Sequence, residues 1–248
     1  MTLTKHRWQG PIYSLLVAVA LWEILAFVIN RPILPYPHAV FAGMIKIFGP
    51  QIKIHLFYSL GRITAGIAIS VLIGVPLGYL MGYYPKVDKV FSPLVYFTYP
   101  IPKLALLPIV MLLFGLGEIS KLIMIIMIIV FQIIIAARDA VRDIPEETFR
   151  SLRSLGASRM QKLTEAMIPA SLPELLTSIR IALGTAVSIL FFTETFGAEY
   201  GMGYFIMDAW MRVNYLEMYA GIVTLSLMGF IIFAAIDFLE SMICGWRS

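Results

Sequence analysis

The chain has 248 residues, of which 60% are hydrophobic and 14% are charged, with a formal net charge of +4. Soluble domains carry about a quarter charged residues, so water is not the main solvent of this chain. Its three histidines lack metal-ligand spacing, its single cysteine excludes an internal disulfide, and its basic residues punctuate apolar segments instead of forming one stripe. We expect a membrane protein without a metal site and without a nucleic-acid partner.

Six apolar stretches are long enough, or nearly so, to cross a bilayer as helices of about 20 residues. Because only helices satisfy their own backbone hydrogen bonds in lipid, we expect an all-α polytopic membrane bundle, a single transmembrane domain over residues 1–248. The predicted spans are Pro11–Ile29, Leu56–Tyr83, Val90–Phe114, Ile119–Ala137, Leu172–Phe192 and Met218–Ile236.

The lysines and arginines between these spans are unevenly divided. If the N-terminus is cytoplasmic, the inner side holds Lys5, Arg7, Lys86, Lys89, Arg138, Arg142, Arg150, Arg153, Arg159, Lys162 and Arg247, and the outer side holds Arg31, Lys46, Lys53 and Arg212. Cytoplasmic segments carry the excess of such residues, so we expect both termini in the cytoplasm. The first apolar stretch is too long for a signal peptide and lacks a small-residue cleavage site, which indicates an uncleaved span.

The second span carries Gly74, Gly78 and Gly82 at four-residue spacing, a glycine seam that allows another helix to approach closely. We favour helix packing over a role in the transport pathway for this seam. Pro76 in the same span is expected to bend it.

The third span is interrupted by YPIPKLALLP, in which Pro100, Pro102 and Pro108 each remove a backbone donor. Such a break is tolerated at membrane depth where protein or a water-lined cavity covers it. Lys103 follows the break near the middle of the membrane, where a cation and a half-helix N-terminus could favour an anion. Lys103 is therefore a candidate translocation-path residue, with a packing lysine at a gate as the alternative.

Charged residues inside other spans must face protein or water. Glu23 and Arg62 lie at similar depths in the first two spans, and we predict a structural ion pair between them. Glu194, at the outer end of the fifth span, is a second candidate for the translocation path; the alternative is a cap on the following turn, GAEYGMG. Arg180 is expected to extend to the cytoplasmic surface.

The segment at about residues 138–170 is too polar to cross the membrane and reads as two short helices. Asp143 and Glu146 have a capping-box-like spacing around Pro145, and Gly156 suits the end of the first helix. Ser158 and Gln161 form a second capping box.

Each of these two helices has a narrow apolar edge, which needs a partner to bury it. The edges consist of Phe149, Leu152 and Leu155 in the first helix, and Met160, Leu163 and Met167 in the second. They either lie back on the protein's own helix ends and lipid headgroups or dock into a groove of a separate cytoplasmic subunit.

A family resemblance lies in the stretch GASRMQKLTEAMIPASLPELLTSIRIALG, which resembles the cytoplasmic signature loop of permease subunits of bacterial ABC importers. Gly156 and Pro169 stand at the separation of that loop's glycine and proline. Arg150, Ser151 and Leu152 replace its EAA triplet, so the resemblance does not imply an ATPase contact through that glutamate. Four further segments resemble the nitrate, sulfonate and taurine group of these permeases: ILPYPHAVF, HLFYSLGRITAGIAISVLIGVPLG, YPIPKLALLPIVMLLFGLGEISK and TETFGAEYGMGYFIMDAW.

The resemblance implies a type I ABC importer-like permease fold in the bacterial cytoplasmic (inner) membrane. It implies a homodimer with a second copy of the chain, an ABC ATPase dimer that binds ATP and Mg²⁺, and a periplasmic or extracellular solute-binding protein. The chain itself has no phosphate-binding loop, so we expect no cofactor in it and no enzymatic activity. The expected ATPase-coupling residues are Phe149, Leu152, Leu155, Gly156, Ala157, Ser158, Arg159, Met160, Leu163 and Pro169.

The substrate implied by the resemblance is a small anion of the sulfonate, taurine, nitrate or bicarbonate class, moved by alternating access. A pyrimidine or riboflavin-type vitamin precursor is the alternative within this family. From other classes of function, a membrane scaffold and a transporter that works alone remain open. The scaffold leaves the glycine seam and the proline break unexplained, and the sequence lacks the internal symmetry typical of secondary transporters.

Overall fold

This computed structural model describes residues 9–245, which form helices joined by short loops and contain no strand, and this confirms the all-α prediction. Its α-helices are α1 (Gln9–Ile29), α2 (Pro37–Ile47), α3 (Lys53–Tyr83), α4 (Pro85–Thr98), α5 (Leu107–Phe114), α6 (Glu118–Arg142), α7 (Glu146–Ser154), α8 (Arg159–Lys162), α9 (Ile168–Thr195), α10 (Met202–Met211) and α11 (Tyr215–Ile243). Three shorter turns connect them: the π-helical η1 (Phe48–Ile52) and η3 (Leu163–Met167) and the 3₁₀ turn η2 (Lys103–Leu106).

Five of the six predicted spans lie within single helices, and the third, Val90–Phe114, is divided among α4, η2 and α5. Four segments of the described chain are long and apolar enough to cross a membrane: Pro37–Tyr83, Glu118–Arg142, Arg159–Thr195 and Tyr215–Ile243. A fifth would combine α4 with Lys103–Phe114 across a bend of 80°, and α1 contributes a shorter apolar helix over Tyr13–Ile29. The bend confirms the break predicted from the prolines. Lys5, Arg7 and Arg247, which entered the charge count, lie outside the described residues.

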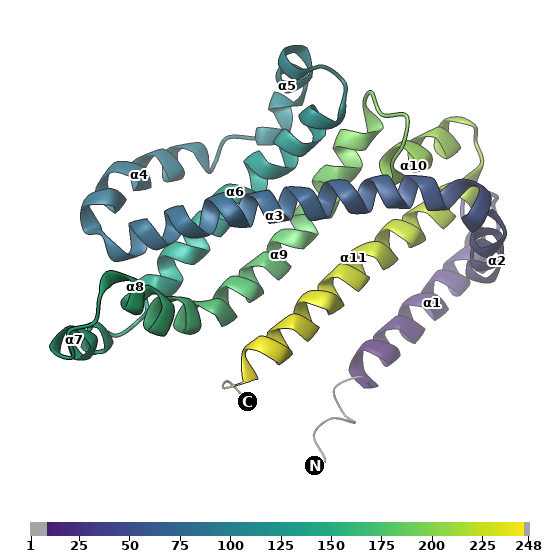
Figure 1. Cartoon of the computed structure of the whole chain (residues 1–248). Coiled ribbons are helices and arrows are strands. Elements are labelled where there is room, and N and C mark those ends of the chain that lie inside the picture. The colour runs from purple at the N-terminus through teal and green to yellow at the C-terminus, as the bar shows by residue number, and fades with distance from the viewer. Residues whose placement is uncertain (1–8, 246–248) are drawn as a thin grey trace.

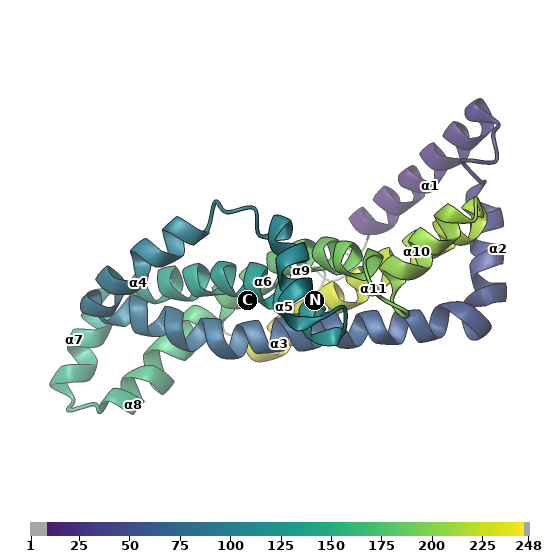
Figure 2. The ribbon, with the colours of Figure 1, turned by 90° about the horizontal axis from the view of Figure 1, so that it is seen from above.

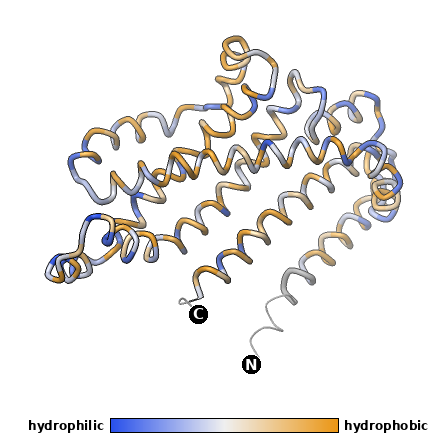
Figure 3. The backbone as a smooth tube through the Cα atoms, viewed as in Figure 1, coloured by the Kyte–Doolittle hydropathy of each residue, from blue (hydrophilic) through white to orange (hydrophobic). Residues whose placement is uncertain are grey.

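Hydrophobic residues run along the long helices, and hydrophilic residues gather at the helix ends and in the α7–α8 segment (Figure 3). Figures 1 and 2 agree in placing α7 and α8 at one end of α3, with α2 and α10 at its other end. The molecule therefore has two polar ends separated by the length of the apolar bundle.

The glycine seam of α3 packs against α6, which confirms the packing interpretation. A Cβ atom added to Gly78 would lie 2.5 Å from the Cβ of Ala137, and one added to Gly82 would lie 2.7 Å from the backbone oxygen of Arg138. Only glycine allows the two backbones to come this close. The core continues from α6 to α9, where Ile125, Ile129 and Leu190 are fully or almost fully buried.

An ion-pair cluster joins the last long helix to the bundle. Arg180 of α9 contacts the carboxylate of Asp237 at 2.6 Å and also that of Glu240, both on α11. The guanidinium of Arg180 is thus held by two acidic side chains of a neighbouring helix, and its extension to the cytoplasmic surface stays a prediction.

Candidate functional site

The turn between α7 and α8 is fixed by a specific backbone pattern. Gly156 has a φ of +76°, and its N–H donates to the carbonyl of Arg153 at 3.0 Å. The N–H of Ala157 donates to the carbonyl of Leu152 at 2.9 Å. Together these bonds form a Schellman motif, in which the left-handed position favours glycine. The prediction that Gly156 ends the first short helix is confirmed.

The second short helix starts as predicted. The Ser158 hydroxyl accepts from the backbone N–H of Gln161 at 3.2 Å, and the Gln161 side chain accepts from the backbone N–H of Ser158 at 2.8 Å. This reciprocal capping box satisfies two of the donors that a helix start leaves open. The turn is therefore held on both sides by local hydrogen bonds.

The capping box predicted for the first helix is absent from α7. The backbone N–H of Asp143 donates to the carbonyl of Asp139, so Asp143 ends α6 instead of starting α7, whose N-cap is Pro145. Glu146 instead contacts Arg150 at 3.0 Å, four residues along the exposed face of α7. The hydrogen bond from Arg150 holds the pKa of Glu146 below its ordinary value.

The two apolar edges of this segment divide into an inner and an outer part. Phe149 packs edge-to-face on the ring of Tyr83, with 5.4 Å between centroids, and Leu163 joins it against the helix ends. Leu155 and Met160, by contrast, are 82% and 67% exposed. Leu152, Ala157 and Pro169 are half-buried, and Gly156, Ser158 and Arg159 are exposed. The segment thus anchors itself on the bundle while presenting Leu155 outward and leaving Met160 exposed in an open groove beside α3.

A buried charge network lies at the opposite end of α3, around Arg62. The Arg62 guanidinium, 4% exposed, contacts the carboxylate of Glu118 from α6 through its Nε at 2.6 Å and that of Glu194 from α9 through Nη1 at 2.7 Å. Nη1 also donates to the backbone carbonyl of Tyr200 at 2.7 Å. One side chain therefore ties three elements and a loop together.

The predicted ion pair between Glu23 and Arg62 is wrong. Glu23 instead lies 3.5 Å from the imidazole of His38, which follows on α2. Equal depth along two spans does not make them neighbours, because α1 packs on α2 while α3 packs on α6 and α9.

Glu194 occupies the centre of the network and is fully buried. Its carboxylate accepts from the hydroxyl of Ser59 at 2.7 Å and from the backbone N–H of Gly203, in the first turn of α10, at 2.9 Å. This geometry favours the capping alternative for Glu194 over a position in the translocation path. Acidic groups are stabilised at helix N-termini by the orientation of the free N–H donors.

Lys103 starts the 3₁₀ turn after the proline break. Its Nζ donates to the backbone carbonyls of Thr98 and Tyr99, at 2.9 and 3.2 Å, at the C-terminal end of α4. It also lies 5.2 Å from the ring centroid of Phe131 on α6. These contacts favour the packing alternative, because the ammonium satisfies the open end of one helix against the face of another.

Sequence reasoning missed Glu118 and Ser59 in the Arg62 network, and it also missed the role of the buried Lys121 near them. Lys121 is 1% exposed, and its Nζ donates to the backbone carbonyls of Leu116 and Gly117 before α6 and of Gly197 after α9. The signal that could have drawn attention to it is a lysine in the first turn of an otherwise apolar helix. Its partner Gly197 lies 76 residues away along the chain, so this contact could not be read from the sequence.

This chain is similar to known membrane components of transport systems. A family model described as the inner membrane component of binding-protein-dependent transport systems matches residues 74–243. The taurine transport system permease protein TauC of Escherichia coli (strain K12) is 32% identical, over 98% of this chain and 94% of its own length. The formylaminopyrimidine transport permease protein ThiX of Halalkalibacterium halodurans is 31% identical, over 98% of each chain.

The fold is also similar to a solved structure of the MetNI methionine ABC transporter in an inward-facing conformation. That match has a TM-score of 0.68 at 22% identity and covers 76% of this chain and 94% of the other. At this identity the likeness concerns the fold, which is that of type I ABC importer permeases, as expected.

The relatives are permease subunits of ABC transporters, in which a separate subunit hydrolyses ATP, so this chain is not an enzyme. Its long apolar helices and its relatives place it in the inner membrane as a multi-pass protein. The chain belongs to the binding-protein-dependent transport system inner membrane components, as an ABC importer permease of the nitrate, sulfonate and taurine type.

Proposed function

We propose that this chain translocates a small sulfonate or related anion by alternating access, driven by a separate ATPase. The observation that carries the proposal is its 32% identity to a taurine permease along 98% of the chain. Because two copies of such a permease form one pathway in this family, we propose a homodimer. ATP and Mg²⁺ would bind to the ATPase subunits alone.

A second candidate substrate is a pyrimidine-type vitamin precursor. ThiX is named as a formylaminopyrimidine permease and is 31% identical over 98% of this chain, almost the same as TauC. In this family the solute-binding protein carries most of the specificity. Identifying the binding protein that stimulates this permease therefore decides between the two substrate classes.

We assign ATPase coupling to the α7–α8 segment. Leu155 is an exposed apolar side chain at a polar end of the molecule, where water is an unfavourable solvent for it. The Schellman motif and the capping box fix the turn that carries Leu155, so a partner groove can bury this side chain without first ordering the chain.

The same segment connects directly to two long helices. It follows the end of α6 after three residues, and η3 continues it into α9 without a break. A push on the α7–α8 segment is therefore transmitted to α6 and α9, which both contribute to the core and to the Arg62 network at the other end. This is the physical requirement for coupling ATPase closure to a change of access.

The test is to co-express the tagged chain with its ATPase and binding protein, reconstitute the complex in nanodiscs, and measure ATP hydrolysis with loaded binding protein. We expect stimulation in the wild type and loss of ATPase association in Leu155→Arg. Ser154→Arg is the matched control, because it adds the same charge one position away on a different face of α7 and should leave association intact.

Two results would contradict the proposal at different levels. If Leu155→Arg still co-purifies with the ATPase and remains stimulated, the coupling surface is wrong while the importer assignment stands. If no ATPase associates with the wild type, a scaffold or a stand-alone transporter becomes the better description.

A further inference from the structure

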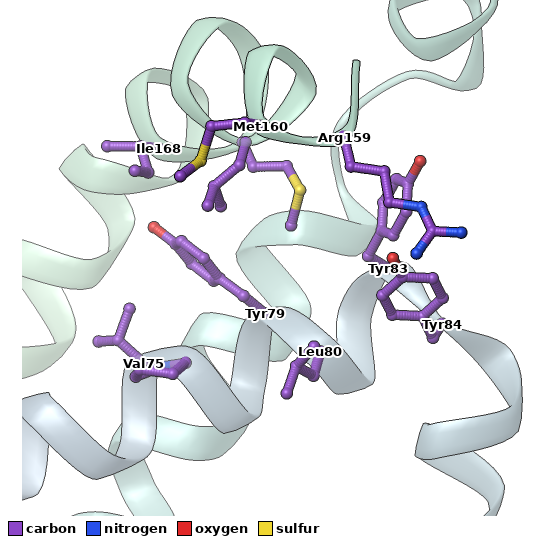
Figure 4. A pocket seen from close by; sticks show the side chains of 11 residues that line it. Val75, Tyr79, Leu80, Tyr83, Tyr84, Arg159, Met160 and Ile168 are labelled. Atoms are coloured by element: carbon purple, nitrogen blue, oxygen red, sulfur yellow. The ribbon is translucent and has the colours of Figure 1, made fainter.

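A groove of about 650 Å³ lies between the C-terminal half of α3 and the α8–η3 segment (Figure 4). Its lining is aliphatic, aromatic or methionine side chains, with one charged exception, Arg159. Figure 4 shows Arg159 at the same end of the groove as Tyr83 and Tyr84, with Val75 and Ile168 toward the other end. The groove is thus apolar along its length and cationic at one end.

The groove is continuous with an apolar outer surface of α3. Leu72 and Ile73, one turn before the first lining residues, are 74% and 50% exposed, and Leu80 inside the groove is 47% exposed. In a membrane-spanning helix such a surface faces hydrocarbon chains. A lipid tail can therefore enter the groove sideways from the bilayer.

The cationic end of the groove coincides with the end of the apolar part of α3. The helix stops at Tyr83, and Lys86 and Lys89 follow it on α4. Tyrosine is enriched at the level of lipid headgroups, and lysine is enriched just beyond it on the cytoplasmic side. Tyr83, Tyr84 and Arg159 thus lie where a headgroup would lie if a tail filled the groove.

Arg159 has no acidic partner among the residues that the structure describes. The other arginines of the segment differ: Arg150 and Arg153 contact Glu146 at 3.0 and 3.6 Å. The one polar group deep in the lining is already satisfied, because the hydroxyl of Tyr79 lies 2.5 Å from that of Ser171. Charge complementarity therefore calls for an amphiphile with an anionic head and an apolar tail.

We propose that this groove binds an anionic glycerophospholipid, with one acyl chain between α3 and α8 and its phosphate at Arg159. The site adds to the ATPase-coupling role and depends on neither the substrate nor the ATPase. A bound chain would pack against Met160 of α8 and Leu163 of η3, which both line the groove. The lipid thereby stabilises the position of the α7–α8 segment relative to α3.

The test uses the full chain in nanodiscs that contain trace amounts of two photoreactive lipids. Both probes carry the same diazirine acyl chain, one on phosphatidylglycerol and the other on phosphatidylcholine, and mass spectrometry locates the labelled residues. We expect phosphatidylglycerol to label the groove about fivefold more than phosphatidylcholine, the factor for one cationic side chain at an anionic surface. Labelling at Leu112, which is 86% exposed on α5, should show no headgroup preference.

Three variants separate the contributions of charge and shape. Arg159→Gln should reduce the headgroup preference to about one, the value without that charge. Arg150→Gln removes a charge from the same segment outside the groove and should leave the preference unchanged. Met160→Trp keeps the charge but fills the groove, and should lower its labelling by both probes.

Two outcomes would overturn the proposal. Equal labelling of the groove by both lipids, unaffected by Arg159→Gln, would mean a non-selective lipid annulus. Labelling at Leu112 together with no labelling in the groove would mean that protein covers the groove, either a second copy of the chain or the ATPase.

Discussion

Arg62 places a permanent charge inside an apolar bundle and finds partners for it on three sides. Burying an unpaired charge costs several kcal/mol, so such a residue persists where its donors all have acceptors. Glu118, Glu194 and the carbonyl of Tyr200 supply those acceptors from α6, α9 and the α9–α10 loop. The network therefore fixes how these elements meet at one end of the molecule.

The members of this network differ in burial, which leads to a graded prediction. Glu194→Gln removes a fully buried carboxylate and leaves part of the Arg62 charge uncompensated, so we expect a loss of about 3 kcal/mol in stability. Glu118→Gln removes a carboxylate whose side chain is 53% exposed, and water can replace it at a cost of about 1 kcal/mol or less. Thermal unfolding in detergent compares the two variants, and equal losses would show that burial does not govern the network.

At the scale of the elements, the contact between α3 and α6 depends on absent side chains. Gly78→Ala would place its Cβ 2.6 Å from the backbone oxygen of Ile134 as well as against Ala137. A backbone atom cannot rotate away, so the helices must separate, and we expect a destabilisation of about 1–3 kcal/mol.

Gly61→Ala, on the same helix, is the matched control. It has no atom within 4 Å of its added Cβ, and we expect its thermal stability to be unchanged or slightly raised. If both variants unfold at the wild-type temperature, the close approach of α3 and α6 has been misjudged.

At Gly156, in the turn between α7 and α8, we expect backbone conformation to decide which substitutions the protein tolerates. No atom lies within 4 Å of a Cβ added there, so a larger side chain has room. The constraint is the backbone φ of +76°, which few non-glycine residues adopt. Asparagine visits this region more readily than other non-glycine residues, and a β-branched residue is strained there. Gly156→Asn should therefore keep most of the binding-protein-stimulated ATP hydrolysis, and Gly156→Val should lose it. Equal activity of both variants would mean that the turn is not held as described.

Sequence patterns predicted features in which one residue type is required at one position, although the local capping box expected at Asp143 and Glu146 did not form. Gly156, the Ser158 capping box and the glycine seam are examples, because their residue types are required by local backbone geometry or by one close contact. The Glu23–Arg62 pair failed because depth in a span says nothing about which spans adjoin. The acceptors of Arg62 lie 56 and 132 residues away, and only the three-dimensional packing brings them together.

The two polar ends of the molecule have different contents. The α7–α8 end carries exposed apolar side chains and an excess of basic residues. The α10 end carries the buried Arg62 network. α3, α6 and α9 connect the two ends through a continuous core. A disturbance at one end can therefore reach the other through rigid helices.

This polarity leads to a last prediction, on orientation. Basic residues favour the cytoplasm for the α7–α8 end, which places the α9–α10 loop outside. We would introduce Ser154→Cys and Glu199→Cys separately, both at exposed positions, and label intact cells with a membrane-impermeant maleimide. The native Cys244 is 5% exposed, so the unmodified chain serves as the background control. Glu199→Cys should react in intact cells and Ser154→Cys only after lysis. The reverse pattern would place the α7–α8 segment outside, where no ATPase could reach it, and would remove the basis of the coupling proposal.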